Sequence, residues 1–170
     1  MTDPRVAEVL RLLNPATGSR PWAGGAKILG CLRGVSVEQA LWRPADDRHS
    51  IWELTLHATY WKYAVRRRLD EGPRGGFPRA PSNWPLAPEE ADATAWKKDR
   101  TLLRSEHELL VDAIEGFDPA RLDEVAPGAS GAYRYLDLMH GIAEHDTYHV
   151  GQIQLMKRLY RSASKLTNPR

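Results

Sequence analysis

Apolar residues along the chain recur mainly at intervals of three, four and seven positions, which is the spacing of one face of an α-helix. The pattern is strongest over residues 51–69, from about 89 to 116 and from about 133 to 160. Weaker patterns predict helical pieces at 6–13, 21–34 and 36–44. No stretch shows the alternation of apolar and polar residues that is typical of a strand. The chain is therefore predicted to be all-α, a bundle of four principal helices with short extra helical turns.

Helix start and stop signals support these ranges. Ser50 and Glu53 have the spacing of a capping box, which predicts the start of the second main helix. Gly72 and Pro73 are expected to end that helix, and Gly116 to end the third. The third helix is expected to open near residues 88–90, where early acidic residues suit the helix dipole. In the 21–34 stretch, the pair at 24–25 is Gly-Gly, which weakens the helical pattern.

Residues 72–88 hold five Pro and three Gly and connect the second and third main helices. We interpret them as a loop and not as a domain linker, since neither flank could bury a core alone. A loop of this length in a small domain is usually functional or mobile. Its two aromatic residues, Phe77 and Trp84, are expected to pack against the helices.

Composition narrows the class of protein. With 170 residues, 42% apolar and 27% charged, the chain is typical of a single soluble domain spanning 1–170. A net charge of +2 gives no general attraction to nucleic acid or anionic lipid. No apolar run is long enough to span a membrane, and the first residues are not expected to act as a secretion signal. We expect a cytoplasmic protein that binds neither nucleic acid nor membrane, with its one cysteine, Cys31, as a buried apolar side chain.

A basic cluster at the end of the second main helix is the feature most like a nucleic-acid patch. It consists of Lys62 and Arg66, Arg67 and Arg68. Cations near a helix C-terminus are favourable to the helix dipole. With so little net charge on the whole chain, we interpret the cluster as a solvated helix end.

The candidate chemistry lies in the last helix, in the sequence GIAEHDTYHVGQ. His145 and His149 are four residues apart, so both rings lie on one helix face and can share a metal ion. The same face carries apolar residues, namely Leu138, Ile142, Met156 and Leu159. Imidazoles on a core-facing stripe need partners, because burying polar groups alone is costly. A metal ion is one solution, and hydrogen bonds to carboxylates or backbone are the other.

A third ligand has to come from another helix, and His57 is the strongest candidate. It lies mid-helix between Leu54 and Trp61, on the apolar stripe of the 51–69 helix. His107, on the stripe of the third helix, is a rival or a fourth member. His140 is about half a turn away from His149 around its helix and is excluded.

Several other polar residues lie near the histidine pair in the sequence or before the second main helix. Gln152 lies on the same face one turn after His149 and could contact a substrate or a water molecule. Glu144, Asp146 and Tyr148 are expected at the sides of the helix, where they either orient the imidazoles or face neighbours or water. His49 precedes the capping box and is expected to be exposed.

The segments SIWELTLHATYWKYAVRRRL and LMHGIAEHDTYHVGQIQLMKRL resemble the two motif helices of the DinB/YfiT-like family of metalloenzymes. The family pattern is a histidine on the second helix and His-x-x-x-His followed by x-Gly-Gln on the last. His57, His145, His149, Gly151 and Gln152 match it. The resemblance spans about residues 20–160 and includes the piece VSVEQALWRP before the second helix.

The resemblance implies a four-helix bundle, often homodimeric, with a divalent metal ion such as zinc or nickel on His57, His145 and His149. Characterised relatives include enzymes that use low-molecular-weight thiols, such as bacillithiol transferases and mycothiol-dependent maleylpyruvate isomerase. Many other members are called metal-dependent hydrolases by inference. No residue of this sequence selects among these activities, and the 72–88 loop aligns with no family site.

Two classes of function therefore stay open. The first is a metal-dependent enzyme with a small-molecule substrate, either a thiol-dependent S-transferase or a hydrolase. Three neutral imidazoles leave the full charge on the ion, which lowers the pKa of a bound water or thiol. The ligand face carries no clear carboxylate base, which slightly favours thiolate chemistry. The second class is a non-catalytic metal-binding bundle with a structural or regulatory site.

Overall fold

The computed structural model describes residues 2–14, 27–70, 75–128 and 131–167. Its helices, in chain order, are α1 (Pro4–Leu13), α2 (Ile28–Cys31), α3 (Val37–Leu41), α4 (Ile51–Leu69), α5 (Ala93–Glu115), the 3-10 turn η1 (Pro119–Arg121) and α6 (Tyr135–Thr167). The described residues contain no strand beyond an isolated bridge between Val125 and Arg134. The all-α prediction is confirmed.

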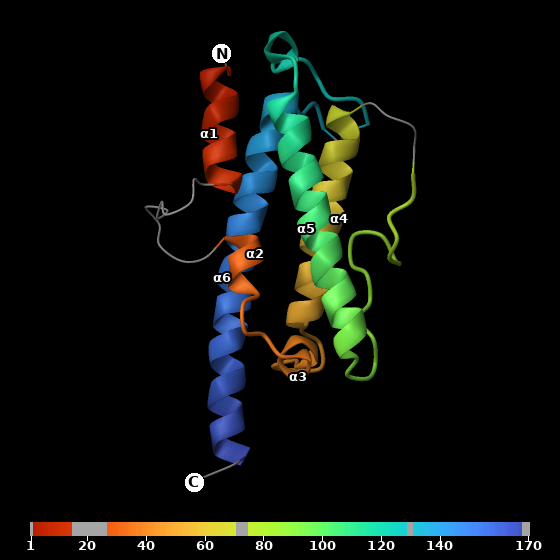
Figure 1. Cartoon of the computed structure of the whole chain (residues 1–170), viewed down its shortest axis with the longest axis vertical. Helices are drawn as coiled ribbons and strands as arrows, with labels where there is room; N and C mark the ends of the chain where they lie inside the picture. Colours follow the sequence, from red (N-terminus) through yellow and green to blue (C-terminus); the bar gives the residue numbers. More distant parts are fainter. Residues whose placement is uncertain (1, 15–26, 71–74, 129–130, 168–170) are drawn as a thin grey trace.

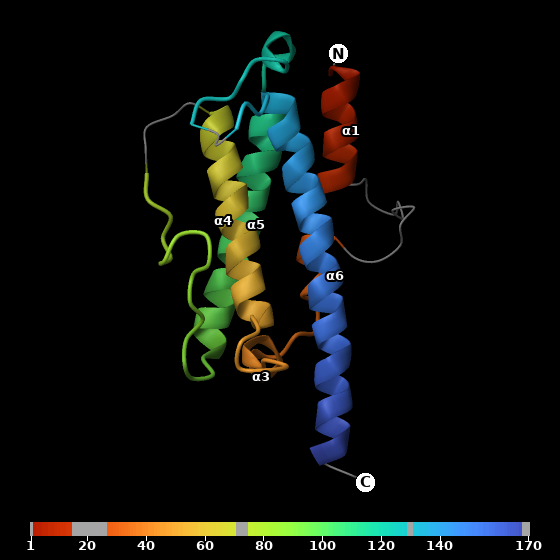
Figure 2. The ribbon, with the colours of Figure 1, turned by 180° about the vertical axis from the view of Figure 1, so that it is seen from behind.

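The three long helices α4, α5 and α6 run side by side and form the body of the bundle (Figure 1). The short helices α1 and α2 both pack on α6, α1 beside its N-terminal half, and α1 also contacts α5. Figure 2 shows α6 passing beyond the rest of the bundle toward the C-terminus. The fourth side of the body is thus shared by two short helices, and α2 is the part of the predicted 21–34 helix that the described residues contain. The expected start of that helix, with Gly24 and Gly25, lies outside the described residues.

Local capping explains where the long helices begin and end. The Ser50 hydroxyl accepts the Glu53 N–H at 3.2 Å, and the Glu53 carboxylate accepts the Ser50 N–H at 2.9 Å, so the predicted capping box is present. α5 begins at Ala93, later than predicted, because the Asp92 side chain accepts the first free N–H groups of the helix. Gly116 caps its C-terminus as expected. α4 ends at Leu69, before the predicted breakers at 72 and 73, which lie outside the described residues.

The interior consists of two apolar clusters separated by a polar layer. One cluster gathers side chains such as Val6, Leu110, Ile114, Tyr135 and Met139, and the other Ile28, Trp52, Leu56, Trp96 and Ile153. Between them, the three long helices contribute buried polar side chains, namely His57, Lys62, Glu106, His107, Asp146 and His149. Buried polar groups need partners inside the protein. The residues of this polar layer are therefore the candidates for the functional site.

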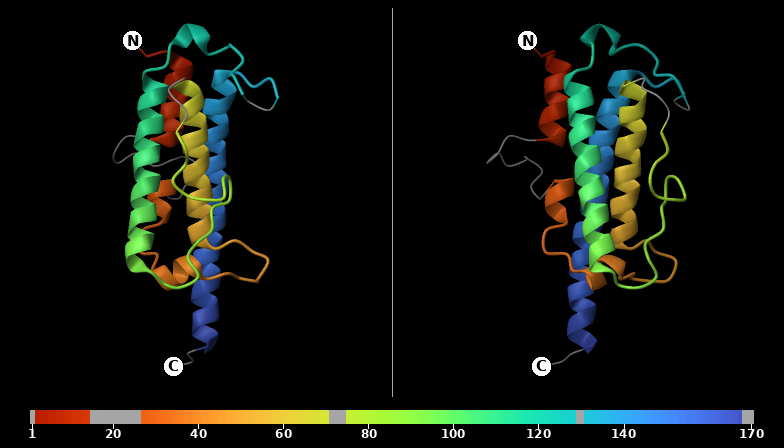
Figure 3. Two further views of the ribbon diagram at one scale, coloured as in Figure 1. Left: turned by 90° about the vertical axis from the view of Figure 1, so that its right-hand side faces the viewer. Right: turned by 45° about the vertical axis from the view of Figure 1, so that its right-hand side comes forward.

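Residues 75–92, which precede α5, follow the outside of α4 and α5 (Figure 3). Phe77 packs edge-on against Tyr60, with 5.5 Å between the ring centroids, and Trp84 stacks on His57. Both aromatic residues therefore pack against the helices, as predicted. The segment is called the strap below, defined as residues 75–92.

Two further expectations have opposite outcomes. Cys31 is buried, as predicted. Lys62, expected in an exposed basic cluster, is fully buried with 0% of its surface exposed. Its ammonium contacts the Asp146 carboxylate at 2.5 Å across the α4–α6 interface, so it does not belong to a solvated helix end. None of the described helices is long and apolar enough to cross a membrane.

Candidate metal centre

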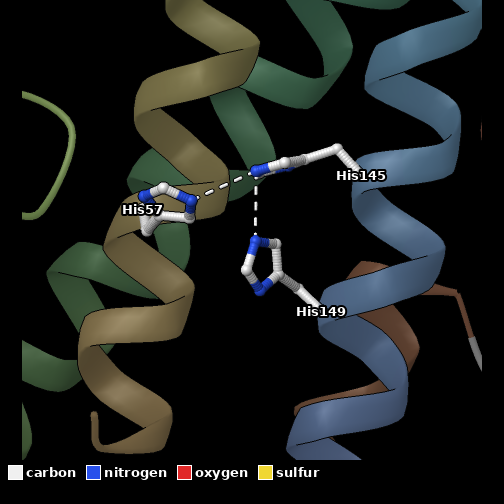
Figure 4. Close-up of side chains that lie close together, drawn as sticks. All are labelled: His57, His145 and His149. Carbon is white, nitrogen blue, oxygen red and sulfur yellow. Dashed lines mark hydrogen bonds between the residues drawn. The ribbon is translucent and has the colours of Figure 1, made fainter.

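Three histidines from two helices meet in the polar layer. His57 comes from α4, and His145 and His149 from successive turns of α6 (Figure 4). The Nε2 atom of His145 lies 3.1 Å from Nε2 of His57 and 3.1 Å from Nε2 of His149. One ligating nitrogen from each ring falls within a group whose atoms all lie within 4.8 Å of one another. The structure thus brings together the three residues that the sequence analysis selected.

The outer nitrogens show which tautomer two of the rings adopt. His57 Nδ1 lies 2.5 Å from the backbone carbonyl oxygen of Asn83, and His149 Nδ1 lies 2.7 Å from Oε1 of Gln152. Both oxygens are acceptors, so Nδ1 carries the proton in each ring. The Nε2 lone pairs of both residues therefore point into the cluster, as metal ligation requires.

The rings are also uncharged at neutral pH. Burial lowers the pKa of His57 to about 4, against a raising effect of its bond to Asn83. Burial, with the adjacent His149 and His57, lowers the pKa of His145 to about 3, and burial lowers the pKa of His149 as well. Neutral imidazole is the form that binds metal, so the three rings release no net proton when an ion binds.

The residues present fit a divalent ion. Metal–nitrogen bonds of about 2.0–2.1 Å place two nitrogens on one ion about 3 Å apart, close to the separation observed between the Nε2 atoms. Two inward lone pairs face each other across His145, whose single Nε2 proton could satisfy only one of them. The Nδ1 atom of His145 is buried and has no hydrogen-bond partner among the described residues. A cation bound by all three Nε2 atoms would satisfy the inward lone pairs that a single proton cannot.

The other histidines lie outside the cluster. His107 is buried on α5, but it does not join the group that could hold an ion; it faces Lys62. His140 is also outside the group, as predicted. His49 is exposed, as predicted, but its ring stacks on Trp84 at 3.8 Å between centroids.

Asp146 takes one of the alternatives left open for it. It is buried and bonded to Lys62, so it faces the neighbouring helix α4 and not water. The buried face of α6 runs through Met139, Asp146 and Ile153, so its centre is displaced from the stripe drawn through His145. Leu159, placed on that stripe, is exposed. The displacement arises because the α4 side of the bundle, where Lys62 lies, covers α6 on the Asp146 side.

A groove of about 490 Å³ reaches the cluster at His149. Its other lining residues are apolar and polar in similar number and comprise Pro44, Asp47, Arg48, His49, Leu54, Trp84, Tyr148, Gln152, Leu155, Met156 and Leu159. Gln152, predicted as a substrate or water contact, lies in this groove while holding His149. Tyr148 is 64% exposed at its wall.

Sequence reasoning missed two residues that contact the cluster from the strap, Asn83 and Trp84. Asn83 acts through its backbone carbonyl, which has no sequence signature. The one available signal is the residue type, since Asn is enriched in the left-handed conformation that Asn83 adopts with φ 72°. Trp84 was expected to pack against the helices, but nothing in the sequence of its loop indicated His57 as the residue it contacts.

Fold and site together define a class: an all-α bundle with three inward histidines, of which two lie one turn apart on the last helix. The family model of the DinB superfamily matches residues 23–153, and the chain belongs to this superfamily. Searches of curated proteins and of solved structures give no match.

Proposed function

We propose that this chain is a divalent-metal-dependent enzyme acting on a small molecule, either as a thiol-dependent S-transferase or as a hydrolase. The observation that carries the proposal is the meeting of three inward Nε2 atoms with a groove that ends at His149. Three protein ligands leave positions open, as catalytic metal sites do. Zinc or nickel is the proposed ion.

We propose that the three histidine rings bind the ion and that the groove binds the substrate. A divalent ion bound by the three rings would supply positive charge that lowers the pKa of a bound water or thiol. His57, His145 and His149 contribute neutral ligands, so they do not diminish that charge. Gln152 fixes the His149 ring and, we propose, contacts the substrate or a water in the groove. The apolar walls would bind the apolar part of a substrate.

The distribution of carboxylates supports the thiol-dependent version. Among the residues that line the groove, the carboxylate is that of Asp47, which lies 3.6 Å from the Arg48 guanidinium. Asp146, next to His145 in sequence, is bonded to Lys62 in the interior. A hydrolase usually needs a general base near its water, whereas a metal-bound thiol needs none after it loses its proton.

The first experiment is elemental analysis of the purified protein and of single-histidine variants. We expect about one divalent ion per chain in the wild type and its loss in His57→Ala, His145→Ala and His149→Ala. His140→Ala is the matched control and should keep the ion, because His140 is on the same helix but outside the cluster. A wild type that takes up neither zinc nor nickel would overturn the proposal.

Turnover assays then separate the two enzymatic versions. The metal-loaded protein is offered electrophiles with a panel of low-molecular-weight thiols and, in parallel, a panel of esters. Thiol-dependent consumption of the electrophile identifies the transferase, and ester cleavage without thiol identifies the hydrolase. Metal binding with no turnover in either panel would favour the alternative, a non-catalytic bundle with a structural or regulatory site.

We also propose a cytoplasmic homodimer, in keeping with the superfamily resemblance. The exposed side chain of Leu166, near the C-terminal end of α6 and outside the groove lining, supports the dimer, because a second copy could cover it. Sedimentation over a range of concentrations tests this association.

A further inference from the structure

The strap contacts the candidate metal ligand His57 through two consecutive residues. The Asn83 carbonyl oxygen accepts the His57 Nδ1 proton at 2.5 Å. The Trp84 ring stacks on the His57 ring with 3.7 Å between centroids and 10° between planes. The imidazole is therefore held at its edge by one residue and on its face by the next.

Asn83 is itself held in place. Its side-chain oxygen accepts the indole N–H of Trp61, one turn after His57 on α4, at 2.8 Å. Its backbone has φ 72°, in the left-handed region that Asn adopts more readily than most residues. The direction of the Asn83 carbonyl is thus fixed by both the backbone turn and the side chain.

Trp84 is held on both faces. His57 covers one face, and His49 covers the other at 3.8 Å with 5° between the planes. His57 cannot swing out of the cluster on this side unless Trp84 moves, and Trp84 cannot tilt without disturbing His49. The stack therefore restrains the ring of the metal ligand independently of any hydrogen bond.

The strap does not depend on these contacts for its attachment. Phe77 packs between Tyr60 and Tyr63. The Arg79 guanidinium forms an ion pair with the buried carboxylate of Asp99. Substitutions at 83 and 84 should therefore change the contacts with His57 and leave the strap attached to α4 and α5.

We propose that Asn83 and Trp84 are a clamp on His57: positioning residues that fix its tautomer and ring plane and thereby set how long the centre retains a divalent ion. The clamp rests on the metal-binding function proposed above. An ion leaves such a site when a ligand ring turns away, and the clamp blocks that movement for His57. Loss of an outer partner of a ligating histidine commonly costs 10–100-fold in metal affinity.

The first test measures the rate at which Zn²⁺ passes from the loaded protein to an excess of chelator. Trp84→Ala should release the ion at least about 10-fold faster than the wild type. Trp84→Phe keeps a flat ring over His57 and should stay near the wild-type rate. Phe77→Leu is the matched control, since it removes an aromatic contact that the same strap makes with Tyr60 and Tyr63 and not with His57. Release from Trp84→Ala at the rate of Phe77→Leu would overturn the role of Trp84.

The second test compares Asn83→Gly with Asn83→Val. Both lose the bond to Trp61, but Gly adopts a positive φ without strain, whereas a β-branched residue does so rarely. Asn83→Val should therefore bind Zn²⁺ about 10-fold more weakly than Asn83→Gly. Equal affinities would show that the carbonyl direction does not matter and would overturn the role of Asn83.

A metal-free measurement separates failure of the clamp from failure of the metal proposal. The ring nitrogen shifts of His57 in NMR spectra of the apo protein report its tautomer. The clamp predicts a pure Nδ1–H form in the wild type and a mixture in Asn83→Val. A mixture already present in the wild type would overturn the clamp. A wild type with the pure form but no uptake of Zn²⁺ would retain the tautomer clamp and overturn the metal function.

Discussion

Gln152 determines which nitrogen of His149 faces the cluster, because its Oε1 accepts the Nδ1 proton at 2.7 Å. Removing that acceptor frees the ring to rotate and to exchange tautomers. We expect Gln152→Ala to lower the affinity for Zn²⁺ by about 10-fold. Gln152→Glu keeps an acceptor in place and should lose less. Competition titrations with a chelator measure both, and unchanged affinity in Gln152→Ala would show that this bond does not orient the ring.

His107 is a buried imidazole without a ligand role, and it should make stability depend on pH. Burial, with the nearby Lys62 ammonium, lowers its pKa to about 4 from the ordinary 6.5. The unfolded chain therefore binds more protons than the folded chain between those values, and stability rises with pH there. The contribution of His107 is complete above about pH 6.5 and is lost as the pH falls toward 4.

Urea denaturation of the metal-free wild type and of His107→Leu at several pH values tests this effect. The free energy of unfolding of the wild type should fall more steeply on acidification, by an additional amount on the order of 3 kcal/mol at most. The other buried histidines titrate in both proteins, so the difference between them isolates His107. Parallel pH profiles would contradict the prediction.

At the scale of the elements, the Lys62–Asp146 pair joins α4 to α6 within the polar layer. Lys62→Met leaves a buried carboxylate without its partner and should destabilise the fold by about 3–5 kcal/mol. The double variant Lys62→Met/Asp146→Leu removes both charges and should be more stable than Lys62→Met alone. Urea denaturation measures both, and a double variant less stable than the single one would show that the two residues act independently.

The Lys62–Asp146 pair shows which features of the fold the sequence pattern could not predict. Helical periodicity and capping residues predicted α4, α5 and α6 and placed His57, His145 and His149 on inward faces. A regular stripe cannot show where the centre of the buried face lies, because neighbouring helices decide it. Lys62 was therefore assigned to a solvated helix end, and the role of Asp146 stayed open, although the two residues form a buried ion pair.

The strap is the second feature that the sequence could not predict. A segment rich in Pro and Gly has no periodicity, so its path over α4 could not be predicted from the sequence. The contact of Asn83 with His57 is made by a backbone oxygen, which every residue type carries. Only the folded chain shows that this loop touches the candidate centre.

At the scale of the whole molecule, the two apolar clusters pack on either side of the polar layer through direct side-chain contacts. The bundle should therefore not need a metal to fold. We expect removal of the ion by a chelator to leave the helical circular-dichroism signal unchanged, while the melting temperature falls through the loss of ligand binding. Loss of helicity on chelation would instead indicate a structural site.

The groove that reaches His149 has a consequence for the release of a bound ion. The strap covers one side of His57, and the groove reaches the cluster at His149. If an ion enters and leaves through this groove, a compound bound there should delay the departure of the ion. A compound that fits the groove should therefore slow the removal of the bound ion by a chelator. This rate could identify ligands of the groove before any reaction is known.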